Sequence, residues 1–447
     1  MLKFFLWLKY LRKRKIILLS IGAVTLACAL LIVIASLFAG FIDAIEKAGA
    51  EILGDVFLSP ARPIQESDEL IRRLEALKEV KAATTVVETY GLVHLGRGNV
   101  RAVKILGIDP AQYAKVTSFK NALLNQKDAD GTPSFEFKGG QKEAAGFVGA
   151  GVLGVPDEKT DEYDFERIKA EWLGKQVVVT CGVVMQGPDE VRPAEDQKVF
   201  KTRKMAFAIA DIVFTGIYFR DKNEIYLPVL RVRELAEQSW NESVQIKLEA
   251  GIEADAAVEV IRRVWEAFAR EQGLSEYEVL HPLLKTSRQM QAFAVAELEK
   301  QKGVLMLIFG VICSGVILLV FCIFYMIVTT KRRDIAIIKS CGTGSFSVWF
   351  IFLGFGFCVG ALGSLAGAAA AWVIVHNVNA LEHTFRILFG LKLWKSSVYI
   401  FQKIPNQIDV TAMLWIIGSA IAAAMLGGLI PAVTAARMKP VEILRYE

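Results

Sequence analysis

Two glycine-rich stretches are where phosphate chemistry would be expected, because closely spaced glycines let backbone amides approach a phosphate group. Gly91 and Gly96 have the spacing of a P-loop, but Arg97 stands where that motif needs a lysine. Residues 149–154 match GxGxxG, yet Pro156 and a charged tract follow where a phosphate-binding helix would begin. The sequence therefore predicts no nucleotide site on this chain.

The cysteines and histidines form no pattern of metal ligands or disulfides. The cysteines in or beside apolar runs are Cys28, Cys313, Cys322, Cys341 and Cys358, whereas Cys181 lies in the hydrophilic section. The histidines, His94, His281, His376 and His383, are scattered. No serine nucleophile elbow, HExxH motif or pair of carboxylates stands out either. We expect no catalytic residue, no metal and no cofactor on this chain.

One basic segment, residues 331–343, carries the most specific combination of side chains. Its members are Lys331, Arg332, Arg333, Asp334, Ile335, Ile337, Ile338, Lys339 and Gly342. A cytoplasmic anchor would account for the positive charge alone. The isoleucines of so short a loop also need a cover, and an amphipathic helix that presents a surface to a partner at the membrane face accounts for both features.

The composition separates the chain into membrane and aqueous parts. Hydrophobic residues make up 53% and charged residues 22% of the 447 residues, and the mean hydropathy is +0.40. Because a bilayer core needs roughly 20 apolar residues in a helix, we predict spans at residues 16–41, 304–328, 348–375 and 410–430. A cleaved signal peptide is the alternative for the first, but its apolar run is too long and continues past Cys28. The formal net charge of +5 gives no case for nucleic-acid binding.

Positive charge orients the predicted spans. Lysine and arginine are concentrated in the N-terminus, in the loop at residues 331–339 and in the C-terminal tail. Four spans put these three regions on one side, and the positive-inside rule makes that side the cytoplasm. Residues 43–302 and 376–409 are then outside the cytoplasm.

The section at residues 43–302 reads as a folded α+β domain. Strands are predicted at residues 52–58, 82–95, 100–108, 244–248 and 277–280, with helices at 67–79 and 254–272. Further strands at residues 176–180, 206–215 and 224–227 belong to an insertion. The resulting βαββ and βαβ halves predict a ferredoxin-like layout with an inserted β-rich subdomain. The fold class is thus an α+β membrane protein with four transmembrane helices and a large external domain between the first two.

The predicted domain boundaries follow from these elements. They are residues 1–42 for the basic N-terminus and first span, 43–285 for the external domain with its insert at about 110–240, 286–330 for a stalk and the second span, 331–346 for the basic segment, and 347–447 for the last two spans. A continuous helix over residues 286–330 would be about 65–70 Å long, so its first half should stand outside the bilayer.

Small residues in the third predicted span indicate close helix packing. One row consists of Gly356, Gly360, Ser364 and Ala368, and a second of Gly363, Gly367 and Ala371. A four-residue spacing places each row on one helix face, where a neighbouring backbone can approach closely.

Three segments resemble a known family. Residues 333–342 are similar to the R-x-E-I-A-I-L-R-x-x-G signature of the FtsX/MacB-type ABC permease superfamily, with Asp334 in place of the usual glutamate. Residues 431–447 resemble the family's C-terminal P-A-x-x-A-x-R-x-x-P-x-E sequence, and residues 210–228 resemble a strand pair of its external domain. The layout of one span, a large domain and three spans resembles the lipoprotein-releasing (LolC/LolE) permeases, as does the loop at residues 380–405. MacB-type members carry a fused N-terminal ATPase, which this chain lacks.

The resemblance implies a type VII ABC system in the bacterial inner membrane, with both termini cytoplasmic and the large domain periplasmic. The implied partners are a LolD-like ATPase dimer that binds ATP and magnesium, a second permease subunit in a homodimer or heterodimer, a lipoprotein substrate, a LolA-like periplasmic carrier and membrane lipids. Residues 331–342 would contact the ATPase. Export of another substrate, as in MacB, and FtsX-like control of a periplasmic hydrolase are the alternatives.

The resemblance also implies two further sites. Acyl chains would enter a cavity lined by Ile34, Leu37, Phe38, Phe41, Met306, Phe309 and Ile312, for which ordinary lipid-facing positions are the alternative. A hook for the carrier would lie in the loop at residues 182–204, at Pro188, Asp189, Glu190, Val191 and Pro193.

Overall fold

The computed structural model describes residues 15–64, 66–96, 98–129, 131–136, 144–157, 160–185, 199–237, 241–389, 394–395 and 403–439. The chain divides into two compact units. The membrane unit comprises Met1–Ala44, Ala294–Leu381 and Ile404–Glu447, and the head comprises Ile45–Phe293 and Glu382–Lys403.

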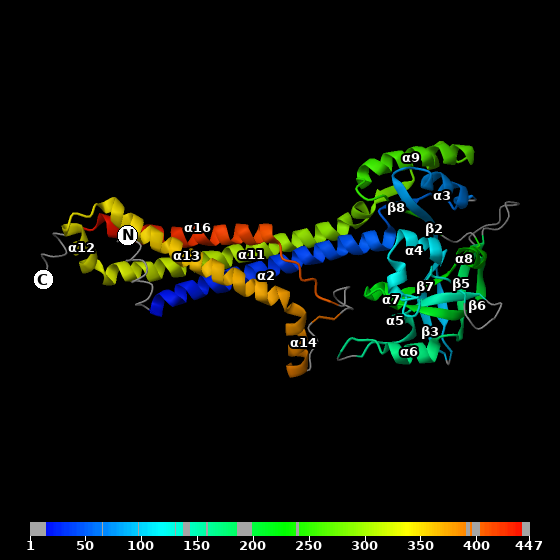
Figure 1. Cartoon of the computed structure of the whole chain (residues 1–447), viewed down its shortest axis with the longest axis horizontal. Helices are drawn as coiled ribbons and strands as arrows, with labels where there is room; N and C mark the ends of the chain where they lie inside the picture. Colours follow the sequence, from blue (N-terminus) through cyan, green and yellow to red (C-terminus); the bar gives the residue numbers. More distant parts are fainter. Residues whose placement is uncertain are drawn as a thin grey trace. The chain divides into compact units, whose positions relative to one another are not determined.

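Four helices in the described part of the chain are long and apolar enough to cross a membrane (Figure 1). They are α2 (Lys15–Leu53), α11 (Ser287–Thr330), α13 (Ser345–His376) and α16 (Val410–Arg437). Each contains one predicted apolar span, and α11 is continuous over its whole length, through Gly303 and Gly310. α2 extends further than expected. Residues 52 and 53, which were predicted to begin a strand, lie in its last turn.

The two rows of small residues in α13 pack against different helices. A Cβ added to Gly360 would lie 2.9 Å from the Ile421 Cα of α16. A Cβ added to Gly367, in the other row, would lie 2.7 Å from the Thr25 carbonyl oxygen of α2. Neither distance leaves room for a side chain, so these glycines let both neighbouring backbones approach α13.

The head contains one nine-stranded sheet, in the order β3-β7-β4-β6-β5-β2-β8-β1-β9. Its strands are β1 (Val56–Ser59), β2 (Val80–His94), β3 (Val100–Ile108), β4 (Ala145–Gly149), β5 (Gln176–Met185), β6 (Val199–Val213), β7 (Glu224–Pro228), β8 (Asn241–Leu248) and β9 (Leu283–Thr286). β2 links the two halves of the sheet, because it pairs with β8 along residues 80–88 and with β5 along residues 91–94. The predicted insertion therefore extends the sheet of the remaining head.

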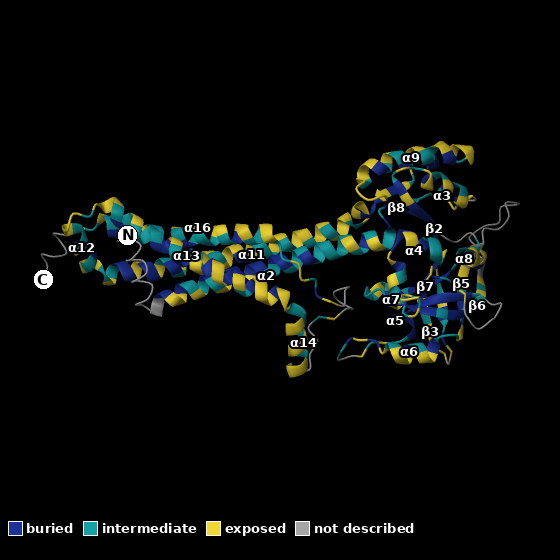
Figure 2. Ribbon diagram, viewed as in Figure 1, coloured by how far each residue is buried: buried dark blue, intermediate teal, exposed yellow. Residues whose placement is uncertain are grey.

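Helices cover the sheet at both ends. They are α3 (Ser67–Glu75), α4 (Pro110–Val116), α5 (Ala150–Leu153), α6 (Phe165–Trp172), α7 (Tyr218–Asn223), α8 (Val229–Ala236), α9 (Ala254–Glu271) and α10 (Glu276–Leu280), with a 3-10 turn at Phe119–Ala122. One core lies under α3 and α9, around Trp265 and Phe268, and another forms around Phe207 and Trp172. Figure 2 shows the strands of the head mostly buried and the outer side of α9 exposed.

Two local predictions for the head were wrong, and one strand was missed. Residues 277–280 form part of α10, because Ser275 and Glu278 make a capping box that starts a helix there. The strand expected at this point is β9, a few residues later. The helix predicted over residues 67–79 ends at Glu75, and β4 was not predicted, since its short glycine-containing sequence lacks a clear alternation.

Candidate functional site

The basic segment forms a short helix, α12 (Arg332–Ser340), between α11 and α13. We refer to it as the coupling helix. Lys331 is its N-cap residue, and Gly342 has a φ of +91°, a conformation that favours glycine and turns the chain toward α13. The amphipathic helix predicted for this segment is therefore present.

The isoleucines of the coupling helix have different surroundings. Ile335 is 5% exposed and packs against Val328, Val348 and Ala435. Ile337 is 47% exposed and Ile338 is half-buried. The helix is thus held to the membrane unit through Ile335, while Ile337 remains accessible.

The charged residues of the coupling helix also divide into two kinds. Lys339 Nζ donates to the carbonyl oxygens of Ala436 and Met438, each at 2.8 Å. These carbonyls lie at the C-terminal end of α16, where a positive charge is stabilising. Lys331 pairs with Asp334 on the helix itself. Arg332 and Arg333 are exposed, so the accessible surface of the helix combines two guanidinium groups with Ile337.

The seven residues predicted to line an acyl-chain cavity do not share one environment. Phe309 is 5% exposed and belongs to the core of the membrane unit, with Ile34 and Met306 packed against that core. Leu37, Phe38 and Phe41 are half-buried. Ile312 is 43% exposed. Phe309 therefore stabilises this chain's own helix packing, and Ile312 is the most accessible of the set.

The five predicted hook residues, Pro188, Asp189, Glu190, Val191 and Pro193, lie outside the described residues. The β5–β6 hairpin that leads to them is described up to the pair Met185 and Val199.

The GxGxxG stretch has a packing role. Gly149 ends β4, and a Cβ added to Gly151 would lie 2.7 Å from the Tyr163 hydroxyl. A Cβ on Gly154 would lie 2.9 Å from the Ile168 side chain. A Cβ on Gly149 would lie 2.4 Å from the Asp221 carbonyl oxygen, so close approaches account for all three glycines.

Sequence reasoning missed a joint at the end of α2. Within the head, the Glu51 carbonyl oxygen accepts from the Ser118 amide at 3.0 Å, and the Ile52 carbonyl oxygen accepts from the Tyr113 hydroxyl at 3.5 Å. Gly54 follows with a φ of +72°. These bonds satisfy carbonyls that a helix end otherwise leaves without partners, and they fix the last turn of α2 to α4.

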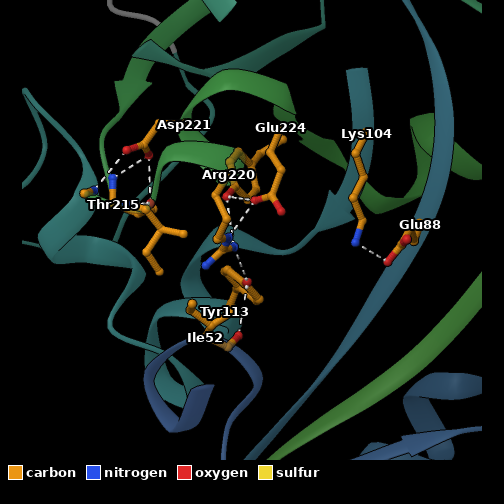
Figure 3. Close-up of polar contacts among 11 residues, drawn as sticks. Ile52, Glu88, Lys104, Tyr113, Thr215, Arg220, Asp221 and Glu224 are labelled. Carbon is orange, nitrogen blue, oxygen red and sulfur yellow. Dashed lines mark hydrogen bonds and ion pairs between the residues drawn. The ribbon is translucent and has the colours of Figure 1, made fainter. Parts of the chain in front are cut away.

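Tyr113 also belongs to a buried polar cluster centred on Arg220. Figure 3 shows the Arg220 side chain pointing toward Glu224. Arg220 Nε donates to Glu224 Oε2 at 2.8 Å, and its Nη2 donates to the hydroxyls of Tyr226 at 3.0 Å and Tyr113 at 3.5 Å. Tyr226 in turn donates to Glu224 at 2.6 Å. Burial by itself would lower the pKa of Arg220, but the charge of Glu224 holds that pKa well above its usual value. Burial raises the pKa of Tyr226 well above its usual value.

A second buried carboxylate, Asp221, orders the adjacent turn. It accepts from the Thr215 amide and hydroxyl at 2.7 Å each and from the Gly216 amide at 3.0 Å (Figure 3). Burial raises the pKa of Asp221 to about 6. The spacing of Arg220 and Glu224, four residues apart, is the one sequence signal that could have indicated this cluster.

α2 and α11 are also joined where both enter the head. Glu46 and Arg288 form an ion pair at 3.3 Å, and the Gln291 amide fills the space over Gly49. The head therefore holds the end of one long helix and the beginning of another.

Comparison with known proteins agrees with this organisation. Residues 306–440 match the family model described as FtsX-like permease C-terminal. This match defines the class that the chain resembles: its C-terminal part, which holds three of the four long apolar helices wholly or in part, is similar to FtsX-like permeases.

Among relatives, the chain is LolC/LolE-like. It is 25% identical to the lipoprotein-releasing system transmembrane protein LolC of Neisseria meningitidis serogroup B, over 98% of each chain. It is 21% identical to LolE of Haemophilus influenzae, over 84% of this chain and 80% of that one.

Solved structures also match, among them the following two. The periplasmic region of MacB from Actinobacillus actinomycetemcomitans matches with a TM-score of 0.29 and 13% identity, over 55% of this chain and 94% of that chain. The extracellular domain of YknZ, from Gram-positive bacteria, matches with a TM-score of 0.28 and 14% identity, over 52% of this chain and 97% of that chain.

Proposed function

We propose that this chain is the transmembrane subunit of an ABC transporter that releases lipoproteins from the bacterial inner membrane toward a periplasmic carrier. The observation that carries the proposal is the similarity to LolC, a lipoprotein-releasing system transmembrane protein, along 98% of both chains. Both termini are cytoplasmic and the head is periplasmic in this proposal, as the distribution of lysine and arginine predicts.

Energy for release comes from a separate ATPase dimer, which holds ATP and magnesium. Removing an acyl chain from a bilayer costs about 0.8 kcal/mol per methylene group, so a lipid anchor does not leave unaided. The coupling helix is the proposed ATPase contact, through Arg332, Arg333 and Ile337. Ile335 and Lys339 attach the coupling helix to the membrane unit. This attachment supports the role, because a helix that receives force from the ATPase must be fixed to the unit that it moves.

α11 supports mechanical transmission from the coupling helix to the head. It follows β9 directly at Ser287 and ends at Thr330, next to the coupling helix. Its 44 residues correspond to about 66 Å at the rise of an α-helix. We infer that a displacement at the ATPase passes along this rigid element to the head, with no substrate path through the spans.

The remaining parts of the proposal concern architecture and partners. The antiparallel order β2-β8-β1-β9, with α3 and α9, supports a ferredoxin-like assignment for that half of the head. A second permease subunit completes the acyl-chain cavity, and the exposed Ile312 lines it. The loop that connects β5 to β6 contacts the carrier.

The test is isolation of the chain from its native membrane, followed by identification of what accompanies it. We expect an ABC ATPase and triacylated lipoproteins. In vesicles, the purified complex should transfer a lipoprotein to the carrier only when ATP is hydrolysed. Isolation with a peptidoglycan hydrolase and without lipoprotein would refute the proposal in favour of an FtsX-like coupler.

The coupling helix has its own test. Arg333→Glu combined with Ile337→Asp should abolish ATPase association, because the change reverses a charge and places a carboxylate on the apolar contact. Cys341→Ser, at another exposed position just beyond the helix, is the matched control and should bind normally. If the double variant still binds and stimulates the ATPase, the contact lies elsewhere.

A further inference from the structure

A second amphipathic helix lies outside the regions used so far. α14 (Val378–Phe389) belongs to the loop between α13 and α16, and none of its residues is buried. Leu381, Phe385 and Leu388 are 41%, 47% and 71% exposed. Their spacing of four and three residues places all three on one helix face. Phe389 is 65% exposed and stacks on Phe385, with ring centroids 5.6 Å apart.

The opposite face of α14 is polar and already has partners. Asn379 exchanges two hydrogen bonds with the backbone of Ile404, at 3.0 and 3.1 Å. Arg386 donates to the Thr160 carbonyl oxygen at 3.2 Å and approaches Glu162 at 3.5 Å. The polar face thus holds protein, whereas the apolar face lies open.

The position of α14 in the chain indicates what covers the apolar face. α13, a helix long and apolar enough to span a membrane, ends at His376, two residues before α14 begins. Trp372 stacks on His376 in this last turn, with ring centroids 5.4 Å apart. Tryptophan near the end of a spanning helix is typical of the membrane–water interface. A helix that begins two residues after a spanning helix ends starts at the membrane surface, and its open apolar face is then within reach of lipid.

We propose that α14 is an interfacial helix, with Leu381, Phe385 and Leu388 inserted among the phospholipids of the outer leaflet. The occupant of the apolar face is the bilayer itself. Large apolar residues on one face and polar residues on the other are the composition of helices that lie in this boundary. This role goes beyond the proposed release of lipoproteins and does not depend on it.

Two adjacent positions offer a matched test. Leu388 lies on the apolar face, and Ile387 lies about 100° away around the helix, yet their exposed fractions are almost equal, at 71% and 70%. We would introduce a photoreactive benzophenone residue at position 388 or 387 of the full chain. Each protein would be reconstituted in vesicles of phosphatidylethanolamine and phosphatidylglycerol, irradiated and analysed by mass spectrometry.

We expect phospholipid adducts at position 388 at a yield roughly fivefold or more above that at position 387. Labels at Phe385 and His383 repeat the comparison with a second pair, which protects the test against one poorly folded variant. Equal yields on the two faces would overturn the proposal. So would adducts at position 388 formed with protein in place of lipid, because a protein partner would then cover the face.

Discussion

Removal of the Arg220 guanidinium should loosen the head locally around β7. In the variant Arg220→Met the Glu224 carboxylate stays buried, since its side chain is only 11% exposed, and it loses its cationic partner. Breaking such a pair from one side costs about 3–5 kcal/mol, because the remaining charge is left uncompensated. The Tyr226 hydroxyl still donates to Glu224 at 2.6 Å, so we expect the lower end of that range.

Hydrogen exchange of the full chain in detergent measures this effect. A loss of about 3 kcal/mol corresponds to roughly 100-fold faster exchange of the β7 amides, since each 1.4 kcal/mol is a factor of ten. Arg231→Met is the matched control. Its ion pair with Glu234 has both side chains more than half exposed, and an exposed pair contributes about 0–1 kcal/mol.

A double-mutant cycle decides whether the charge pair causes the loss. Arg220→Met/Glu224→Gln has no orphaned carboxylate, so it should be less destabilised than the sum of the single variants, by about 0.5–3 kcal/mol. Additive losses, or a cost for Arg220→Met no larger than that of Arg231→Met, would refute the reasoning.

Three further predictions concern single residues. Because the pKa of Asp221 is raised to about 6, the folded head binds a proton more tightly than the unfolded chain, so this residue's contribution to the free energy of unfolding falls as pH rises from about 4 to 6. Asp221→Asn should flatten this pH dependence in urea titrations. An unchanged pH dependence would contradict the assignment. Gly367→Ala should lower the free energy of unfolding of the membrane unit by about 1–3 kcal/mol, because the added methyl group overpacks against α2. Gly310→Ala is the control in a detergent melting assay, since a Cβ there would have nothing within 4 Å. Equal shifts in melting temperature would contradict the packing argument. Lys339→Met should lower the local stability of the last turn of α16 by about 1 kcal/mol and so speed hydrogen exchange of its amides. Unaltered exchange would show that the lysine does not hold that turn.

The coupling helix was predictable because its signals are local. Gly342 marks its end, and the basic residues and isoleucines are close together in the sequence. The division of roles within it was not predictable. Ile335 is buried because residues near 328, 348 and 435 converge on it, and no local pattern specifies that convergence.

Apart from the spacing of Arg220 and Glu224, the members of the cluster around Arg220 could not be predicted, for a related reason. Tyr113 contributes to it from 107 residues away, and a tyrosine in a short helix gives no sign of a distant guanidinium. The error at residues 277–280 has a different origin. There a local signal, the capping box at Ser275 and Glu278, was present and outweighed the strand propensity of the tyrosine and valine.

The sequence by itself determined the four long apolar helices, the short helix between α11 and α13, and the faces along which α13 packs. Hydropathy, helix-breaking residues and four-residue spacing act over one or two turns, so they can be read without partners. Tertiary structure decided which row of α13 meets α2 and which meets α16. It also decided that β2 joins both halves of one sheet, and that Arg220 is charged inside the head. These outcomes depend on pairing and burial between segments far apart in the chain, whose energies exist only once the fold has brought the segments together.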